Sequence, residues 1–296
     1  GDRWLSHRGG FPKGGTPSRD SCRYRNARHR GDGGGTGGAA HDGDGWLILG
    51  TTGFVGTLLP SIHDRRSEES MLVATGRGTQ VLEFMAPMTG TPNLDWIRHT
   101  LGLADESWET IEARARLSRP GANGVVYLPY ASPGGERAPF VDTNASASWM
   151  GMSLTTTPED VLRSVYEGVA LSLADCVAHL AMTGDLVVSG GGFRSDLVCE
   201  ILADVTGQCV VRQSAPEAGA RGAAVLALVS GGRYDTVEDA STAMTCSFEC
   251  FDPHPVRGEI YRAVANVYSD SRSAVCPVWP QMRALRQMEE TANVSV

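Results

Sequence analysis

The apolar residues of this chain fall into short runs separated by turn residues, and this pattern predicts an α/β fold that starts near Trp46. Runs at residues 46–50 and 54–60 flank the turn Gly50-Thr51-Thr52-Gly53 and predict a β-hairpin. Because later strand-like runs alternate with helical patterns, the segments should combine into a layered domain with a mixed sheet. Further strands are expected at residues 71–76, 124–130, 186–189 and 208–213.

The clearest helical pattern runs from about Pro158 to Met182. Thr157 is a suitable N-cap, Pro158 fits the first helical position, and Glu159 and Asp160 favour the positive end of the helix dipole. These features predict a well-defined helix start. Further helices are expected at residues 91–103, 105–117, 195–207 and 215–231, and in the stretch 251–296.

The N-terminal part of the chain lacks this periodic pattern. The first 45 residues hold 13 of the 36 glycines and 8 of the 26 lysines and arginines. Such a stretch cannot bury enough apolar surface to offset the entropy lost on ordering, so it is predicted to be irregular or disordered. The chain is therefore divided into an irregular segment at residues 1–41, a folded domain at 42–250 and a helical tail at 251–296.

Charge and cysteine content narrow the function classes. The net charge of −8 and the pI of about 5.4 argue against a nucleic-acid or anionic-membrane partner, because both require clustered Lys and Arg. No apolar run is long enough to cross a bilayer and no signal-peptide pattern is visible, so a cytoplasmic location is expected. The 7 cysteines are irregularly spaced, which predicts free thiols, and the pair Cys246 and Cys250 has no second pair for a zinc site.

Two glycine-containing turns are candidates for binding phosphate. The turn at residues 50–53 presents two hydroxyls and backbone N–H groups, although an ordinary hairpin turn also fits its sequence. At residues 187–197 three glycines lead from a strand into a helix that begins near Ser195, which suits a bound anion or a tight turn without ligand. A dinucleotide fold is disfavoured, because the third glycine of GxGxxG is missing and no acidic residue ends the next strand.

Other motifs restrict the chemistry further. Glu136 and Arg137 lie in a loop rich in Pro and Gly, and are interpreted as a surface ion pair or as solvated charges. The chain has no GxxxxGK[ST], GxSxG or HExxH motif, so a Walker-type loop, a serine-hydrolase elbow and a zinc-protease site are not indicated. No metal-ligand set is assigned.

Six segments, taken in order, resemble the C-terminal half of the FGGY family of carbohydrate kinases, which includes glycerol kinase and xylulokinase. The family's C-terminal signature fits the stretch from Gly151 to Glu167, including Asp160, Ser164 and Tyr166. The motifs GTTGFVG and MTGTPNLDW resemble the xylulokinase-like members more closely than the glycerol kinases. The six segments lie at residues 42–56, 88–99, 128–140, 147–176, 187–207 and 217–227.

This resemblance implies an actin-like ATPase domain of the ribonuclease H-like type, with a mixed sheet and helices on both faces. It also implies transfer of the γ-phosphate of ATP to a hydroxyl of a sugar or polyol, with ATP and Mg²⁺ as cofactors and a small molecule as acceptor. The chain is compatible with a homo-oligomer. The alternative is a catalytically incompetent nucleotide-binding or structural remnant of such a kinase.

The resemblance also assigns site residues. The threonine turn, with Gly50, Thr51 and Thr52, would contact the β- and γ-phosphates, and the region around Gly90 would face the nucleotide. The second glycine turn would lie against the α-phosphate and adenosine. It contains Gly190, Gly191 and Gly192, with Ser195 at a position where some members use Asn.

The sequence departs from the family on its N-terminal side. Relatives have a first domain with a DxGT-type phosphate turn and most of the sugar contacts, and residues 1–41 do not match it. Relatives also place a catalytic aspartate upstream of the threonine turn, at the start of an Ala-rich helix. Asp32 lies 18 positions before Gly50 without a helical pattern behind it, and is the candidate general base. The abrupt change of composition at Ala39 suggests that the preceding residues are read from a different frame.

Overall fold

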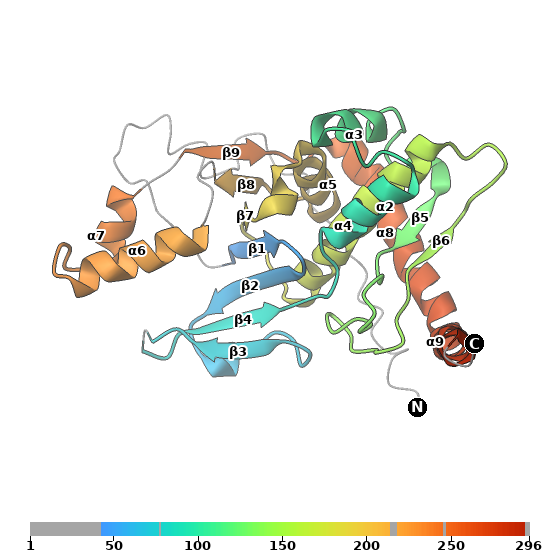
Figure 1. The fold of residues 1–296 in the computed structure, drawn as a ribbon. Coiled ribbons are helices and arrows are strands. Elements are labelled where there is room, and N and C mark those ends of the chain that lie inside the picture. Colours follow the sequence, from blue (N-terminus) through green and yellow to red (C-terminus); the bar gives the residue numbers. More distant parts are fainter. Residues whose placement is uncertain (1–42, 77, 214–217, 245–246, 294–296) are drawn as a thin grey trace.

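The computed structural model describes residues 43–76, 78–213, 218–244 and 247–293. The strands of its central sheet are β1 (Gly45–Leu49), β2 (Gly53–Leu59), β3 (Met71–Ala74), β4 (Val81–Met85), β7 (Leu186–Ser189), β8 (Val210–Gln213) and β9 (Phe248–Phe251). They lie in the order β3-β4-β2-β1-β7-β8-β9 (Figure 1). β1 and β2 form the predicted hairpin, β1, β7 and β8 are parallel, and the other pairs are antiparallel, so the predicted mixed sheet is confirmed.

Side-chain alternation along β1 separates the two faces of the sheet. Leu47 and Leu49 are fully buried, whereas Ile48 between them is 45% exposed. Because successive side chains of a strand point to opposite faces, one face contributes to the main core and the other is more open. The helices α4 (Pro158–His179) and α5 (Asp196–Thr206) cover the core face. The helices α6 (Ala218–Ser230) and α7 (Val237–Ala243) lie on the other side of the sheet (Figure 1).

The central helix α4 starts as its sequence predicts. The Thr157 hydroxyl accepts a hydrogen bond from the Asp160 amide at 3.2 Å, and the Asp160 carboxylate accepts one from the Thr157 amide at 3.0 Å. This reciprocal pair is a capping box, and Pro158 occupies the first turn. The helix ends at His179 rather than at Met182, because Ala181 adopts a left-handed φ of 45° that helical residues do not share.

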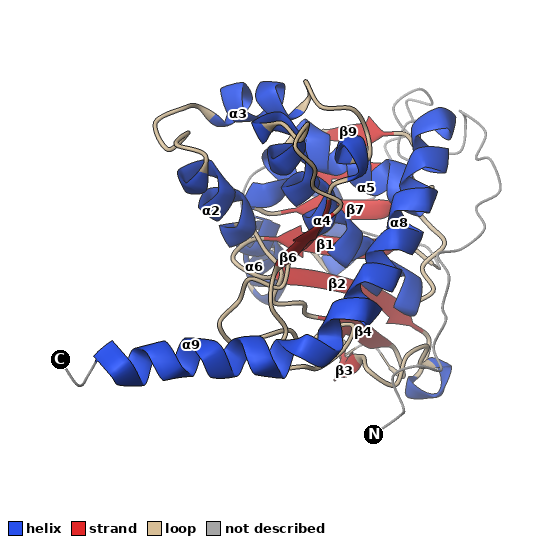
Figure 2. Cartoon of the chain, turned by 90° about the vertical axis from the view of Figure 1, so that its right-hand side faces the viewer, coloured by secondary structure: helices blue, strands red, loops and turns tan. Residues whose placement is uncertain are grey.

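An outer layer of helices packs on α4 and α5. It consists of α2 (Pro92–Thr100), α3 (Trp108–Ala115) and α8 (Pro255–Val275). Tyr261 of α8 is fully buried in the same core cluster as α4, so α8 packs against the domain. The next helix, α9 (Trp279–Asn293), projects from the body of the molecule (Figure 2). Beside this layer, β5 (Val126–Leu128) and β6 (Ser148–Met150) form a separate two-stranded sheet.

Several details differ from the expectations or add to them. The strands β4 and β9 were not expected from the pattern, because their short apolar runs are interrupted by Glu83 and Glu249. The helix α7 was not expected because its sequence is mostly polar or small. The expected strand at 124–130 is shorter and belongs to the separate small sheet. Five cysteines lie within the described residues and no two of them are joined by a disulfide, in agreement with the predicted thiols, whereas Cys22 and Cys246 lie outside these residues. Among the described helices, none has the length and apolar character needed to span a bilayer.

Candidate functional site

Two parallel strands bring the two predicted glycine turns to one edge of the sheet. In the register of β1 and β7, Ile48 pairs with Ser189, so the turns that follow these strands are neighbours. From β1 the chain turns back into antiparallel β2, whereas from β7 it crosses through α5 to parallel β8. The chain therefore leaves the two strand ends in opposite directions. Ligands of α/β sheets typically bind at such a switch point, outside the carboxyl ends of the strands.

The threonine turn is held by backbone contacts and leaves its hydroxyls open. The Gly50 amide donates to the Thr52 carbonyl at 3.2 Å. Thr51 is exposed and Thr52 is half-buried, and neither hydroxyl forms a hydrogen bond with another described residue. The Thr51 and Thr52 amides likewise donate to no carbonyl of the described chain. The turn thus presents hydroxyl and N–H donors without a bulky side chain in front of them.

Gly90 packs directly against this turn. A Cβ atom at Gly90 would lie 2.2 Å from the Thr51 carbonyl oxygen and 2.7 Å from that of Gly50, distances that no side chain tolerates. The neighbouring Thr91 amide donates to the Gly50 carbonyl at 2.8 Å. Glycine is therefore required at position 90, and the structure places this region directly against the first turn.

The second turn uses its three glycines differently. Gly190 has a φ of +98°, and a Cβ atom there would lie 2.7 Å from the Leu49 carbonyl oxygen. A Cβ atom at Gly192 would lie 2.4 Å from the Leu49 side chain. The middle glycine, Gly191, would place its Cβ in open space, with no atom of the described residues within 4 Å. The outer glycines thus pack the turn against β1, while Gly191 leaves its face open to a ligand.

These segments meet in one place, and we call residues 50–53, 87–91 and 190–192 the glycine corner. All glycines predicted for the site belong to it. The Gly192 Cβ position is also 3.0 Å from the Thr91 side chain, which connects the second turn to the segment that supports the first. The surfaces that meet in the corner are largely backbone, and concave arrangements of backbone N–H groups can bind phosphate oxygens.

Ser195 lies at the edge of the corner with its hydroxyl already engaged. It caps the N-terminus of α5, where its oxygen accepts from the Val198 amide at 3.2 Å. Its hydroxyl donates to the Glu112 carboxylate of α3 at 2.6 Å, and the same carboxylate accepts from the Leu197 amide at 3.1 Å. Glu112 was not predicted as part of this region, because nothing in the sequence connects a helix surface residue to a turn 83 positions away.

Glu136 corrects an interpretation of the sequence. It is 2% exposed, so the expectation of a surface ion pair or a solvated charge is wrong for this residue. Its carboxylate accepts from the amides of Met88 at 2.5 Å and Arg137 at 2.8 Å, and from the Thr89 hydroxyl at 3.1 Å. Burial raises the pKa of Glu136, and these donors act in the opposite direction. Arg137 is exposed, and its guanidinium donates to the Ala86 carbonyl instead.

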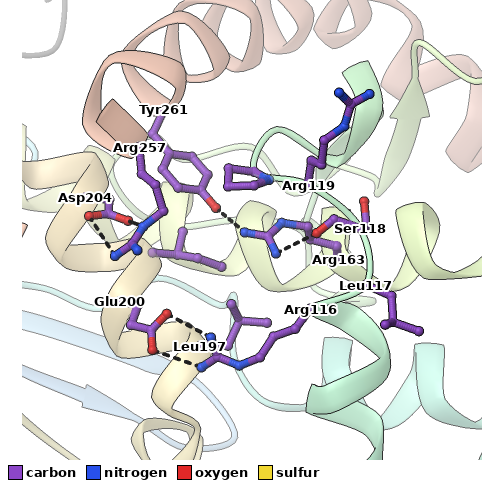
Figure 3. Close-up of a pocket in the computed structure, with 12 residues that line it drawn as sticks. Arg116, Leu117, Ser118, Arg119, Arg163, Leu197, Glu200, Asp204, Arg257 and Tyr261 are labelled. Atoms are coloured by element: carbon purple, nitrogen blue, oxygen red, sulfur yellow. Dashed lines mark hydrogen bonds and ion pairs between the residues drawn. The ribbon is translucent and has the colours of Figure 1, made fainter. Parts of the chain in front are cut away.

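A separate pocket of about 270 Å³ lies among the helices α3, α4, α5 and α8, and we call it the arginine pocket (Figure 3). Three of its arginines form ion pairs with neighbouring carboxylates, at 2.9 Å for Arg116 with Glu200, 2.7 Å for Arg163 with Glu167 and 2.5 Å for Arg257 with Asp204. None of the predicted site residues lines it. Its lining comprises Arg116, Leu117, Ser118, Arg119, Pro120, Arg163, Leu197, Glu200, Ile201, Asp204, Arg257 and Tyr261.

Two expected components of a kinase site are not supplied by the described residues. Asp32, the candidate base, lies outside them. Within the described part of the chain, no three His, Cys, Asp or Glu side chains gather closely enough to hold a metal ion. The glycine corner offers hydroxyls and amides but no such carboxylate set, so its own side chains do not fit a resident Mg²⁺ ion.

The comparison with known protein families decides the identity of this fold. The model of the C-terminal domain of the FGGY family of carbohydrate kinases matches residues 45–231. This chain belongs to that family. The matched range contains all three segments of the glycine corner, and the predicted resemblance is thereby confirmed.

Individual relatives agree with this assignment. The chain is 31% identical over 273 residues to an erythritol kinase of Brucella abortus, which covers 84% of this chain and 49% of that protein. It is 32% identical over 180 residues to a xylulose kinase of Staphylococcus epidermidis, covering 60% of this chain and 36% of the relative. The FGGY chain thus spans half or less of the length of these curated relatives.

Solved structures confirm the fold. A xylulose kinase from Lactobacillus acidophilus superposes with a TM-score of 0.73 at 23% identity, covering 81% of this chain and 49% of that one. A gluconate kinase from the same organism gives a TM-score of 0.74 at 24% identity, with 84% and 51% covered. The actin-like α/β architecture expected from the sequence is therefore the observed one.

Proposed function

We propose that this chain is the nucleotide-binding half of a carbohydrate kinase and that its glycine corner holds the phosphates of ATP. The observation that carries this proposal is the convergence of two open turns on one edge of the sheet. Thr51 and Thr52 offer hydroxyls and amides from one side, and Gly191 leaves the other side open. Phosphoryl transfer depends mainly on positioning and on stabilising charge, and such a corner contributes both.

The two turns suit different parts of the nucleotide. The threonine turn would contact the β- and γ-phosphates, and the turn at Gly190, Gly191 and Gly192 would lie against the α-phosphate and adenosine. Ser195 would act at the edge of the site by fixing the start of α5, since its hydroxyl is bound to Glu112. Mg²⁺ would accompany the nucleotide, held by phosphate oxygens and water.

The reaction that we propose for the whole kinase is transfer of the γ-phosphate to a hydroxyl of a sugar or polyol. The relatives support this substrate class, since they are named erythritol kinase and xylulose kinase. A cytoplasmic location and Asp32 as general base belong to the same proposal. A chain that binds ATP without transferring phosphate is the second candidate, because this chain spans about half the length of its relatives.

Titration calorimetry tests the nucleotide-binding part of the proposal. We expect MgATP to bind and NAD to give no heat of binding, and absence of MgATP binding would contradict the proposal. A coupled assay of ADP release with polyols and ketopentoses then separates the two candidates. We expect no acceptor-dependent ADP release from this chain alone, and clear release would show that it carries out the transfer itself.

A further inference from the structure

A buried glutamate outside the glycine corner holds one of its three segments. The loop at residues 134–140 carries Glu136 to the segment 87–91, nearly fifty positions earlier in the chain. One carboxylate oxygen of Glu136 accepts from the Met88 amide at 2.5 Å. The other accepts from the Thr89 amide at 3.3 Å and from the Thr89 hydroxyl at 3.1 Å. A single side chain therefore binds two consecutive residues of the segment.

The loop that carries this carboxylate is itself fixed. The backbones of Glu136 and Asp142 exchange two hydrogen bonds of 2.9 Å, which close the loop. Gly135 lies so close to the opposite side of this loop that a Cβ atom would be 2.2 Å from the Asp142 carbonyl oxygen. The oxygen that accepts from Met88 also accepts from the Arg137 amide at 2.8 Å. The direction of the Glu136 side chain is thus set from within its own loop.

On its other side, the segment 87–91 carries the threonine turn. The Gly53 amide donates to the Pro87 carbonyl at 3.0 Å, and the Thr91 amide donates to the Gly50 carbonyl at 2.8 Å. Gly90, between these two bonds, lies against the Thr51 carbonyl. The threonine turn is therefore hydrogen-bonded at both ends to the segment 87–91, and Glu136 binds the middle of that segment.

We propose that Glu136 is a positioning residue for the threonine turn, and that it acts through Met88, Thr89 and Gly90. The part of this inference that concerns phosphate binding rests on the proposed function above. Ionised carboxylates are rarely fully buried without several donors, and the donors of Glu136 come largely from this one segment. Loss of these contacts would free the segment and, with it, the two bonds that hold the turn.

A second buried glutamate provides a matched control. Glu83 is 0% exposed, and its carboxylate accepts from the amides of Arg66 and Ser67 at 3.0 Å each and from the Ser70 hydroxyl at 2.6 Å. The loop that contains Arg66, Ser67 and Ser70 follows the C-terminal end of β2, whereas the threonine turn precedes the N-terminal end of that strand. Both glutamates thus hold a loop through two amides and a hydroxyl, Glu83 with a single carboxylate oxygen, but only Glu136 is connected to the turn.

The experiment compares Glu136→Gln with Glu83→Gln by amide hydrogen exchange and by MgATP calorimetry. Glutamine keeps the size of the side chain but replaces one acceptor oxygen with a donor. We expect Glu136→Gln to speed exchange of the Gly53 and Thr91 amides about tenfold, because one lost buried acceptor corresponds to roughly this factor in local opening. We expect MgATP affinity to fall about fivefold or more in parallel. Glu83→Gln should leave both quantities unchanged, even if it lowers the melting temperature by the same amount.

The outcomes separate this inference from the proposed function. If both variants change exchange at Gly53 and Thr91 equally, Glu136 is a structural residue only and the inference is overturned. If the wild-type chain does not bind MgATP, the proposed function fails, and the exchange data still decide whether Glu136 holds the turn. Should Glu136→Gln not fold, Thr89→Val removes one of its donors, and unchanged exchange at Gly53 and Thr91 in that variant would contradict the inference.

Discussion

The glycine corner and the arginine pocket differ in whether their hydrogen-bond donors are already engaged. The corner has open amides and hydroxyls and an open face at Gly191, but no charged side chain within it. The pocket has four arginines, yet three of them are ion-paired and Arg163 also donates to the Ser118 carbonyl and the Tyr261 hydroxyl (Figure 3). In the proposed function, unsatisfied donors rather than positive charge therefore mark the phosphate site of this acidic protein.

The largest expected effect is a loss of folding stability on changing an arginine of the arginine pocket. Arg163→Met leaves the buried Glu167 carboxylate without its partner, and one oxygen of Glu167 already lacks a hydrogen bond within the described structure. We expect the free energy of unfolding to fall by about 3–5 kcal/mol, as measured by denaturant titration. Arg116→Met is the control, because its side chain is 37% exposed and such pairs contribute about 1 kcal/mol or less. A loss of equal size in both variants would refute this view of the pocket.

The second effect concerns packing within the glycine corner. Gly90→Ala places a methyl group 2.2 Å from the Thr51 carbonyl oxygen, so the turn or the segment has to move. We expect a loss of about 1–3 kcal/mol in unfolding free energy together with weaker MgATP binding. Gly191→Ala is the matched control, since its Cβ meets no atom within 4 Å in the part of the chain that the structure describes. Unchanged stability of Gly90→Ala would show that the described contact is not a tight one.

The third prediction separates ligand binding from folding. Gly191→Val should leave the unfolding free energy within about 0.5 kcal/mol of the wild type, because the added atoms point into open space. The same atoms would occupy the space of the phosphate, so we expect MgATP affinity to fall about tenfold or more by calorimetry. If Arg116→Met weakens MgATP binding and Gly191→Val does not, the nucleotide binds at the arginine pocket and not at the glycine corner, contrary to our proposal.

The smallest effect is expected from a single hydroxyl. Thr51→Val removes one exposed donor from the threonine turn without changing the shape of the side chain. We expect MgATP binding to weaken by about 1 kcal/mol, the usual contribution of one such hydrogen bond. Thr100→Val, on the exposed side of α2, serves as the control and should leave the affinity unchanged. Equal MgATP affinities of the wild type, Thr51→Val and Thr100→Val would show that the Thr51 hydroxyl does not contact the phosphates.

The sequence predicts the glycine turns of this site better than the side-chain contacts that hold those turns in place. The glycines at positions 50 and 190–192 are visible as turn signals, and the start of α4 follows from Thr157 and Asp160, because these are local relations along the chain. Gly90 is assigned only through the family resemblance. Glu136 is not predictable in the same way, since its donors at Met88 and Thr89 come from another element and its own loop composition is typical of a surface. Contacts between distant segments depend on tertiary structure, which spacing along the chain does not encode.

The corner's role in phosphate binding is tested most directly by a crystal structure of this chain with a non-hydrolysable ATP analogue and Mg²⁺. We predict that the triphosphate lies between the threonine turn and Gly191, with its oxygens within hydrogen-bond distance of the Thr51 and Thr52 amides. Density for the triphosphate among Arg116, Arg119 and Arg257, with the glycine corner empty, would contradict this role.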